Sequence, residues 1–457
     1  MYLFNTLGRR RVPFDPREPG KVAMYVCGPT VQAAPHLGHG RAAVVFDVVA
    51  RYLRWRGYEV TYVRNVTDVD DKIIATALAE GVSTDEVVAR SYAAFSEAFA
   101  RLRVEPPTVE PWATHHIPEM IELIERLVET GHAYAAGGDV YFSVRSFADY
   151  GKLSGRDLDE LLSGARIAPG DHKRDPLDFA LWKAAKEGEP SWPSPWGPGR
   201  PGWHIECSAM ARRYLGDGFD IHGGGQDLVF PHHENEIAQA EAATGKPFAR
   251  YWLHNGMVNL GGEKMAKSTG HVVDLLGALD RWDPLAVRLF YLRTHYRKPI
   301  EFTEEALADA EASLRRLWAF RRRVDAVEAT PDREVLDRFI AAMDDDFDVA
   351  GALAVVFEAV REGNRRLDAG EDVGGIAAAY DEVVGVLGLA EEVAAVTIPD
   401  TLAARFGTEA TVDALVARRE EARRARDWAT ADAIRDALAE VGIVVEDTPH
   451  GARWHRR

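Results

Sequence analysis

The fold is decided by the stretch Val22-Ala23-Met24-Tyr25-Val26-Cys27-Gly28-Pro29 and the segment that follows it. Residues 22–27 form an apolar, β-branched run that Gly28-Pro29 interrupts, which predicts a buried strand. Apolar residues at helical spacing predict a helix over 38–56, and residues 60–66 predict a second strand. Strand, helix and strand in this order form a βαβ unit, so we expect an α/β protein with a Rossmann-type nucleotide-binding domain built on a parallel sheet.

Patterns farther along the chain predict its organisation. We expect a Rossmann-type catalytic domain over 1–245, with a connective insertion at about 103–201, and a linking segment over 246–302. Long Ala-, Leu- and Glu-rich helical patterns predict a helical bundle domain over 303–398. A small mixed C-terminal unit follows over 399–457.

Local patterns predict the elements within these parts. Further helices are expected at 70–80, 84–102, 117–130, 204–215 and 234–243, a strand at 219–222, and a hairpin around Gly137-Gly138-Asp139. The Pro-, Gly- and Trp-rich segment 190–203 predicts an ordered loop. One basic helix over 412–441 and a short strand over 443–445 are expected near the C-terminus.

Composition excludes several classes of protein. The chain has 457 residues, 46% of them hydrophobic and 28% charged, which is typical of a globular protein of several domains. Its apolar runs are too short for a membrane-spanning helix, and the first residues lack the pattern of a secretion signal, so we expect a cytoplasmic protein that does not bind membranes. The net charge of -17 argues against a general nucleic-acid binder, although it leaves room for a local basic surface.

The first motif that carries chemistry is His36-Leu37-Gly38-His39, between the first strand and its helix. The first amides of a helix bind phosphate, and Gly38 lets a ligand approach the backbone. The imidazoles of His36 and His39 can donate hydrogen bonds to a phosphoryl transition state. The motif therefore indicates a nucleotide-binding site.

The second motif is Lys264-Met265-Ala266-Lys267-Ser268, preceded by Gly261-Gly262-Glu263. Two lysines three residues apart in a Gly-flanked loop can neutralise charge as pyrophosphate leaves a nucleoside triphosphate. Taken alone, the pentapeptide is equally compatible with a solvated surface loop.

The third group of residues is a candidate metal centre. Both cysteines of the chain, Cys27 and Cys207, take part in it, together with His232 and Glu236. His232 and Glu236 lie four residues apart and so share one face of a helix. Two Cys, one His and one Glu make a suitable four-ligand zinc shell.

Together these motifs resemble class I aminoacyl-tRNA synthetases, whose HIGH and KMSKS motifs correspond to residues 36–39 and 264–268. Within that class the chain is similar to the cysteinyl-tRNA synthetase family. The matching segments are Tyr25-Val26-Cys27-Gly28-Pro29-Thr30-Val31, Asn65-Val66-Thr67-Asp68-Val69-Asp70-Asp71-Lys72, Gly202-Trp203-His204-Ile205-Glu206-Cys207-Ser208, Asp220-Ile221-His222-Gly223-Gly224-Gly225 and Phe230-Pro231-His232-His233-Glu234-Asn235-Glu236. Asp427-Trp428-Ala429 and Gly442-Ile443-Val444 resemble the family's anticodon-contacting unit.

The resemblance implies a set of functional residues. It implies one zinc ion per chain, held by Cys27, Cys207, His232 and Glu236, which binds the thiolate of L-cysteine. It also implies a cysteine pocket lined by Gly28, Thr67, Trp203, His222 and Asp227. ATP, accompanied by Mg²⁺, would be bound by His36, Gly38, His39 and Lys267, with His36, His39, Lys264 and Lys267 acting in catalysis. The implied partners are ATP, L-cysteine and tRNA(Cys), and we expect a monomer.

The chain departs from the family pattern at a few positions. Ala266 stands where the family usually has Ser, Thr269-Gly270-His271 follows the second motif, and Gln32-Ala33-Ala34-Pro35 precedes the first. Both lysines remain. Loss of one hydroxyl hydrogen bond, about 0.5–1.5 kcal/mol, predicts slower adenylate formation rather than an inactive protein.

Two alternative functions remain open. The cysteine ligase of mycothiol biosynthesis resembles the same catalytic core but has no use for the C-terminal unit after Pro399. A catalytically silent paralogue that binds tRNA is favoured only by Ala266 and His271, and the intact His36 and His39 argue against it.

Overall fold

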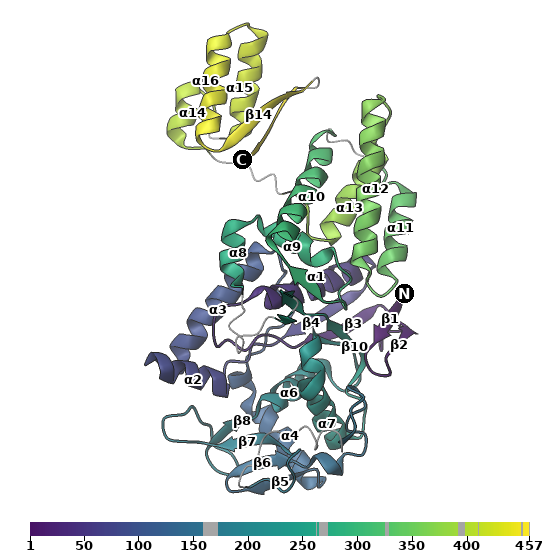
Figure 1. Ribbon diagram of the computed structural model, residues 1–457, viewed down its shortest axis with the longest axis vertical. Coiled ribbons are helices and arrows are strands. Elements are labelled where there is room, and N and C mark those ends of the chain that lie inside the picture. Colours follow the sequence, from purple (N-terminus) through teal and green to yellow (C-terminus); the bar gives the residue numbers. More distant parts are fainter. Residues whose placement is uncertain are drawn as a thin grey trace. The chain divides into compact units, whose positions relative to one another are not determined.

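The structure is a computed structural model that describes residues 1–158, 172–261, 263–264, 273–324, 329–391, 398–409, 411–448 and 451–456. The chain forms two compact units (Figure 1). The first comprises residues 1–317 and 327–389, and the second comprises residues 318–326 and 390–457. No helix in the described ranges combines the length and apolar character needed to cross a membrane.

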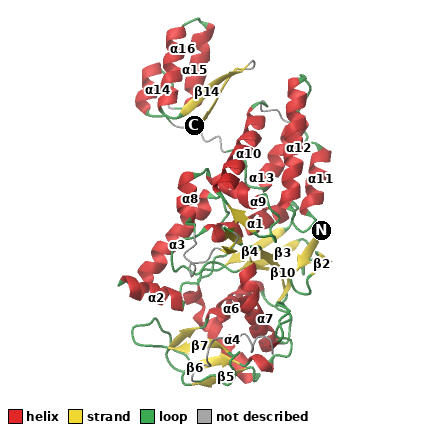
Figure 2. Ribbon diagram, viewed as in Figure 1, coloured by secondary structure: helices red, strands yellow, loops and turns green. Residues whose placement is uncertain are grey.

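A parallel sheet forms the centre of the first unit (Figure 2). Its strand order is β10 (Ala249–Asn255), β9 (Phe219–Gly225), β3 (Lys21–Val26) and β4 (Glu59–Arg64). Each strand pairs with its neighbour in parallel register, for example Val22 opposite Val60 and Met24 opposite Ile221. The expected Rossmann-type sheet is therefore confirmed, and it continues into β10, beyond residue 245.

The crossover between β3 and β4 is helix α1 (Leu37–Trp55). Its fully buried residues include Val44, Phe46, Val48 and Leu53, which give it the apolar stripe that the sequence predicts. Parallel strands need such a crossover, because a short turn cannot return the chain to the same end of the sheet.

The segment between β4 and β9 contains the helices α2 (Asp71–Glu80), α3 (Thr84–Arg101) and α4 (Ile117–Glu129) and an antiparallel sheet. The sheet has the order β5 (Ala133–Ala136), β6 (Asp139–Phe142), β7 (Phe179–Ala184), β8 (Gly199–Pro201). The hairpin around Gly137 is confirmed. The expectation of a loop over all of 190–203 was wrong at its end, because Arg200 and Pro201 pair with β7 as an edge strand, where proline is tolerated.

Helices α6 (Trp203–Leu215) and α7 (Glu234–Thr244) flank β9, and β11 (Val258–Leu260), β12 (Glu263–Lys264) and β13 (Ile300–Phe302) form a further small sheet. The N-terminal hairpin and two short helices complete this part: β1 (Tyr2–Asn5), β2 (Arg10–Pro13), α8 (Leu275–Arg281) and α9 (Pro284–Leu292). Short single-turn helices lie at Ala113–His116, Val144–Ser146, Gln226–Leu228 and Val229–His233.

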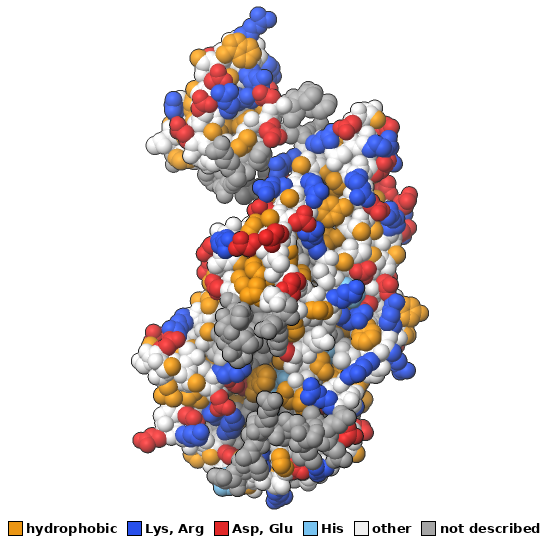
Figure 3. All heavy atoms as spheres, in the orientation of Figure 1, with side chains coloured by type: hydrophobic (Ala, Val, Ile, Leu, Met, Phe, Trp, Pro, Cys, Tyr) orange, Lys and Arg blue, Asp and Glu red, His pale blue; other side chains and the backbone are white. Residues whose placement is uncertain are grey.

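The expected helical bundle is formed by α10 (Glu304–Arg322), α11 (Arg333–Met343), α12 (Val349–Asp368) and α13 (Gly374–Val386). Basic and acidic side chains are interspersed over the face of the bundle drawn in Figure 3. They form surface ion pairs such as Arg366 with Glu362, whose Nε and Oε1 atoms lie 2.8 Å apart.

The second unit contains α14 (Asp400–Phe406), α15 (Val412–Arg424), α16 (Trp428–Glu440) and a hairpin of β14 (Ile443–Thr448) and β15 (Gly451–Arg456). The single helix expected over 412–441 was wrong. Arg426 adopts φ 59°, a left-handed conformation that ends one helix before Asp427 caps the next. The basic cluster is also partly internal, because Arg419 forms a bidentate ion pair with Asp447 at 2.6 and 3.0 Å.

A buried ion pair connects α1 with α9 in the first unit. The guanidinium of Arg288 is fully buried, bonds the carboxylate of Asp47, and donates to the carbonyl oxygens of Leu102 and Leu387 at 2.9 and 2.8 Å. One side chain thus joins the sheet domain to the end of α13.

We predict that Arg288→Met destabilises the protein by about 3–5 kcal/mol, because the carbonyl oxygens of Leu102 and Leu387 would lose their donor and buried Asp47 would keep, of its ion pairs, only the one with Arg51, at 2.8 Å. The melting temperature, followed by tryptophan fluorescence, should fall accordingly. Arg293→Gln is the control. Arg293 pairs with Asp309 on the surface, and its loss should change stability by less than about 0.5 kcal/mol. Equal melting temperatures for both variants would contradict the role given to Arg288.

Candidate active site and metal centre

A hollow of about 260 Å³ lies at the carboxyl ends of the parallel strands, where open α/β sheets bind their ligands. It brings together residues that lie far apart in the sequence. The sequence-predicted residues that line it are Cys27, Gly28, His36, Gly38, His39, Thr67, Trp203, Cys207, Asp227 and His232.

The HIGH-like segment occupies the N-terminus of α1. Nδ1 of His36 accepts from the amide of Gly38, and Nδ1 of His39 accepts from the amide of His36, both at 3.1 Å. The two rings stack with their centroids 3.8 Å apart. Because each Nδ1 accepts a backbone hydrogen bond, the neutral ring carries its proton on Nε2. The segment therefore presents two imidazole N–H donors.

Cys27, Cys207, His232 and Glu236 converge at the base of the hollow, with one ligand atom of each within 4.8 Å of the others. The two sulfur atoms are 3.6 Å apart, Cys27 Sγ lies 3.3 Å from Glu236 Oε1, and His232 Nε2 lies 3.0 Å from the same oxygen. Tetrahedral zinc with Zn–S bonds of about 2.3 Å would place two sulfurs about 3.7 Å apart, which fits this spacing.

The charges of these side chains are interdependent. Burial acts to raise the pKa of Cys207, but the hydrogen bond from Cys27 and the neighbouring His232 outweigh it and lower that pKa to about 6. Burial acts to lower the pKa of His232, but Glu236 and Cys207 raise it to about 10. Burial likewise acts to raise the pKa of Glu236, yet His222 and His232 hold it well below its usual range. The site thus contains anionic donors suited to a cation.

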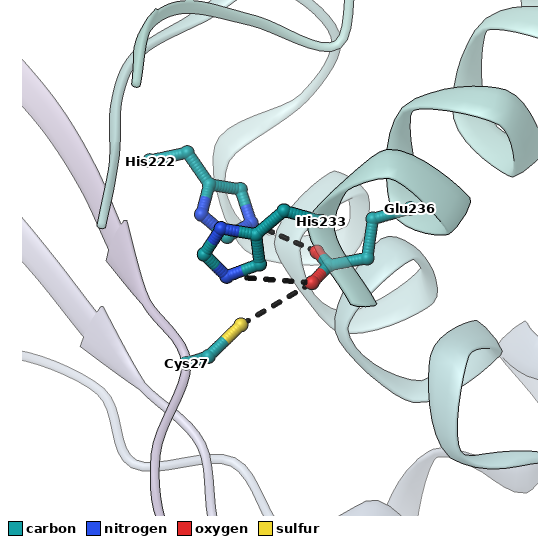
Figure 4. Close-up of side chains that lie close together, drawn as sticks. All are labelled: Cys27, His222, His233 and Glu236. Carbon is teal, nitrogen blue, oxygen red and sulfur yellow. Dashed lines mark hydrogen bonds and ion pairs between the residues drawn. The ribbon is translucent and has the colours of Figure 1, made fainter. Parts of the chain in front are cut away.

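A second set, Cys27, His222, His233 and Glu236, also lies close enough to hold an ion. Their side chains turn toward the carboxylate of Glu236 (Figure 4). Two hydrogen bonds already occupy this set: His222 Nε2 lies 2.8 Å from Glu236 Oε2, and His233 Nδ1 lies 2.8 Å from His254 Nε2. This second set does not include Cys207. Because thiolate is a preferred zinc ligand, the first set, which has two cysteines, has the better donors.

The remaining walls hold the predicted pocket residues with one exception. Trp203 stacks on His232 with ring centroids 4.3 Å apart, and the hydroxyl of Thr67 donates to buried Glu206 at 2.9 Å. His222 is fully buried behind Glu236 and is not among the residues that line the hollow. It therefore contacts a candidate ligand rather than the space where cysteine would lie.

The KMSKS-like segment is only partly described. Lys264 ends β12, which pairs with β11, whereas residues 265–268, including Ala266 and Lys267, and His271 lie outside the described residues.

Several site residues gave no decisive signal in the sequence. His204 Nδ1 lies 2.9 Å from His232 Nδ1, and His233 and His254 continue the contacts around Glu236. Arg64 and Lys72 line the hollow as well. Arg64 precedes the family-like segment 65–72 and Lys72 ends it, but the resemblance implies no role for either side chain.

Sequence comparison identifies the family of this site. Residues 13–312 match the class I tRNA synthetase (C) catalytic domain, residues 338–391 a DALR domain, and residues 407–454 the cysteinyl-tRNA ligase anticodon binding domain. The cysteine–tRNA ligase of Alkalilimnicola ehrlichii is 53% identical over 466 residues, with both chains covered completely. That of Halorhodospira halophila is 52% identical over 458 residues, which cover 99% of each chain.

The chain belongs to the cysteine–tRNA ligase family.

Solved structures agree on the fold of this family. A methionyl-tRNA synthetase of Mycobacterium tuberculosis superimposes with a TM-score of 0.60 at 16% identity, covering 81% of this chain and 90% of that one. The LeuRS of Agrobacterium radiobacter superimposes with a TM-score of 0.58 at 13% identity, covering 82% and 84%. The predicted class I synthetase fold is confirmed.

We predict that Gly28→Ala disrupts the pocket of this cysteine–tRNA ligase family member. An added Cβ would lie 1.6 Å from the carbonyl oxygen of Asn65, so the loops after β3 and β4 would have to separate. Cysteine-dependent pyrophosphate exchange should fall by at least about tenfold, the effect of about 1.4 kcal/mol on the barrier. Gly385→Ala, in α13 with open space around the added atom, should leave exchange unchanged. Full exchange in Gly28→Ala would show that the two loops tolerate a side chain.

Proposed function

We propose that the chain activates L-cysteine with ATP to cysteinyl-adenylate and transfers the cysteinyl group to tRNA(Cys). The observation that carries this proposal is the placement of Cys27, Cys207 and His232 in the same hollow as His36 and His39, with Glu236 within 4.8 Å of the first three. A soft-ligand metal centre beside a phosphate-binding helix end suits a substrate that carries both a thiol and a carboxylate to be activated.

The metal centre is proposed to hold one zinc ion through Cys27, Cys207, His232 and Glu236. When bound, zinc would keep the substrate thiol deprotonated and in place, because zinc binds thiolate in preference to a hydroxyl. Loading would release the protons on Cys27 and His232. Discrimination against serine then follows from the ligand preference, without a second, hydrolytic site.

The remaining walls orient the substrates. Nε2–H of His36 and of His39 would donate to the phosphate that is attacked, and the amide of Gly38 would lie beside it. Lys264 and Lys267 are proposed to neutralise the leaving pyrophosphate, with Mg²⁺ accompanying ATP. Gly28, Thr67, Trp203 and Asp227 would enclose the cysteine, and His222 would position Glu236 through its 2.8 Å hydrogen bond.

We assign the remaining function, tRNA recognition, to the domains that the sequence predicts after the catalytic domain. The C-terminal unit, from about residue 399, would bind the anticodon, as its match over 407–454 supports. The same match argues against the amino-sugar ligase of mycothiol biosynthesis, which has no tRNA to recognise. We further propose that the protein works as a monomer in the cytoplasm, where translation enzymes act.

We predict that purified protein charges a tRNA(Cys) transcript with labelled cysteine when ATP and Mg²⁺ are present, and that excess serine does not compete. Label recovered with the tRNA measures the reaction. Cysteine-dependent pyrophosphate exchange without charging would instead indicate an amino-sugar ligase, and absence of both would indicate a silent paralogue.

We predict that Cys207→Ser loses zinc, because a neutral hydroxyl is a poor zinc ligand. Metal analysis of the purified variant should give far less than one ion per chain, and titration calorimetry should show weakened cysteine binding. His233→Gln tests the second set of donors and should keep its zinc. Zinc lost from His233→Gln but retained in Cys207→Ser would assign the ion to Cys27, His222, His233 and Glu236.

A further inference from the structure

One side of the hollow is formed by residues 255–258, which we call the β10–β11 turn. The residues of this turn that line the hollow are Asn255, Gly256, Met257 and Val258. The chain continues from the turn through β11 to β12, which ends at Lys264. The position of the β10–β11 turn therefore determines where Lys264 lies relative to His36 and His39 at the start of α1.

The chain that returns after the lysine segment is bonded to the start of α1 through its backbone. The amide of Leu37 donates to the carbonyl oxygen of Val273 at 3.2 Å, and the amide of Leu275 donates to that of Pro35 at 3.0 Å. Among the residues that the structure describes, no backbone hydrogen bond joins α1 to the β10–β11 turn. A side chain of α1 makes that second connection instead.

This side chain is Arg41, which follows the HIGH-like residues in α1 and is fully buried. Its Nη1 donates to the carbonyl oxygen of Met257 at 2.8 Å, and its Nη2 donates to those of Tyr296 and Lys298. The segment that contains these last two residues lies against the turn. The amide of Gly256 donates to Tyr296 at 2.7 Å, and a Cβ at Gly256 would lie 2.3 Å from the carbonyl oxygen of Lys298. The guanidinium thus holds the turn and the segment before β13 against α1.

Stability alone does not account for a charge at this position. Burial lowers the pKa of Arg41 to about 10, so the guanidinium stays charged at neutral pH, and no carboxylate in the described part of the chain forms an ion pair with it. Burying a charge without a counter-ion is costly, and apolar side chains often replace buried charges without loss of stability. Two of the three acceptors also have backbone donors, since Ile300 donates to Met257 and Gly256 to Tyr296. The forked donor group is therefore better explained by the position that it gives to the turn.

We propose that Arg41 is a positioning residue for the activation of cysteine by ATP, because it fixes the β10–β11 turn against α1 and so sets Lys264 relative to the imidazoles of His36 and His39. This inference rests on the proposed function, which assigns these groups to the attacked phosphate and to the leaving pyrophosphate. Arg41 is not among the residues that line the hollow, so it acts through the turn rather than on the substrates.

The step that depends on this position is the formation of the adenylate. A carboxylate oxygen of cysteine bonds to the α-phosphorus of ATP, the bond from that phosphorus to the bridging oxygen breaks, and pyrophosphate leaves with the electron pair. Donors to the attacked phosphate and to the leaving group must be placed correctly at the same moment. Transfer to tRNA occurs after pyrophosphate has left, so it should depend much less on Arg41.

Arg41→Met tests the inference, because methionine fills much of the space but has no hydrogen-bond donor. We expect kcat/KM for ATP in cysteine-dependent pyrophosphate exchange to fall about 10- to 100-fold, as a displacement of about 1 Å in reacting groups would cause. KM for cysteine and single-turnover transfer from preformed cysteinyl-adenylate to a tRNA(Cys) transcript should each change by less than about threefold. The zinc content should equal that of the unaltered protein.

Arg288→Met is the matched control. Arg288 is also fully buried and also donates to backbone carbonyl oxygens, but its acceptors, Leu102 and Leu387, do not line the hollow. At a temperature at which the control is folded, it should show a lower melting temperature but an unchanged kcat/KM for ATP.

Arg41→Lys is a second variant that keeps the charge and replaces the fork by a single ammonium group. Its kcat/KM for ATP should fall by about 3- to 10-fold, less than in Arg41→Met. Melting temperatures identify variants that fail to fold. If Arg41→Met is one of them, Arg41→Lys decides the question.

Three results would overturn the inference: an unchanged kcat/KM for ATP in the folded Arg41 variants, an equal loss of zinc, cysteine binding or transfer, or the same loss of exchange in Arg288→Met. The second result would show a general disruption of the site, and the third would show that any loss of stability slows activation. Failure of the unaltered protein in both exchange and charging would instead overturn the proposed function.

Discussion

The buried carboxylate of Glu236 is the constraint on which the site depends. It is fully inaccessible to solvent, so its charge requires compensation from the side chains around it. His222 supplies a hydrogen bond from β9, His232 supplies one from the turn before α7, and the thiol of Cys27 approaches from the end of β3. These elements can meet only if β3 and β9 are adjacent and parallel, with their carboxyl ends level. The metal donors can therefore come together only in a sheet with this strand order.

The parallel arrangement of β3 and β9 also explains why the metal centre and the phosphate-binding start of α1 share one hollow. The loop after β3 carries Cys27 toward the metal centre and then leads into α1, whose N-terminus presents His36 and His39. A thiol bound at the metal centre and a phosphate bound at the start of α1 would thus share one hollow. The hydrogen bonds that the backbone donates to each Nδ1 leave Nε2–H of both neutral imidazoles as a donor.

Much of this could be predicted from the sequence, because its signals are local. The run 22–27, the stripe of α1 and the strand 60–66 each have an unambiguous period, and they define the βαβ unit. The break at Arg426 was not predictable, since a left-handed arginine has no compositional signal and the flanking helices share one pattern. The four metal donors were proposed from residue type, but spacing alone could not place His222 behind Glu236. Arg64 was missed because an arginine in a strand usually indicates a surface, and only burial shows otherwise.

The structure of the connective insertion is relevant to how a cysteine–tRNA ligase would discriminate cysteine from serine. Its buried residues Phe142, Leu181 and Trp182 belong to the same hydrophobic core as Tyr25, Ile205 and Phe219 of the catalytic sheet and α6. A domain that hydrolysed misacylated products would need a core and a pocket of its own. Here the described part of the insertion instead packs into the catalytic core. Its Lys183 and Arg200 bond Asp71 at the start of α2, next to Lys72, whose ammonium lies 5.7 Å from the centre of the Trp203 ring. The insertion thus supports the wall that covers His232. Selection between thiol and hydroxyl would then fall to the metal centre that this wall encloses.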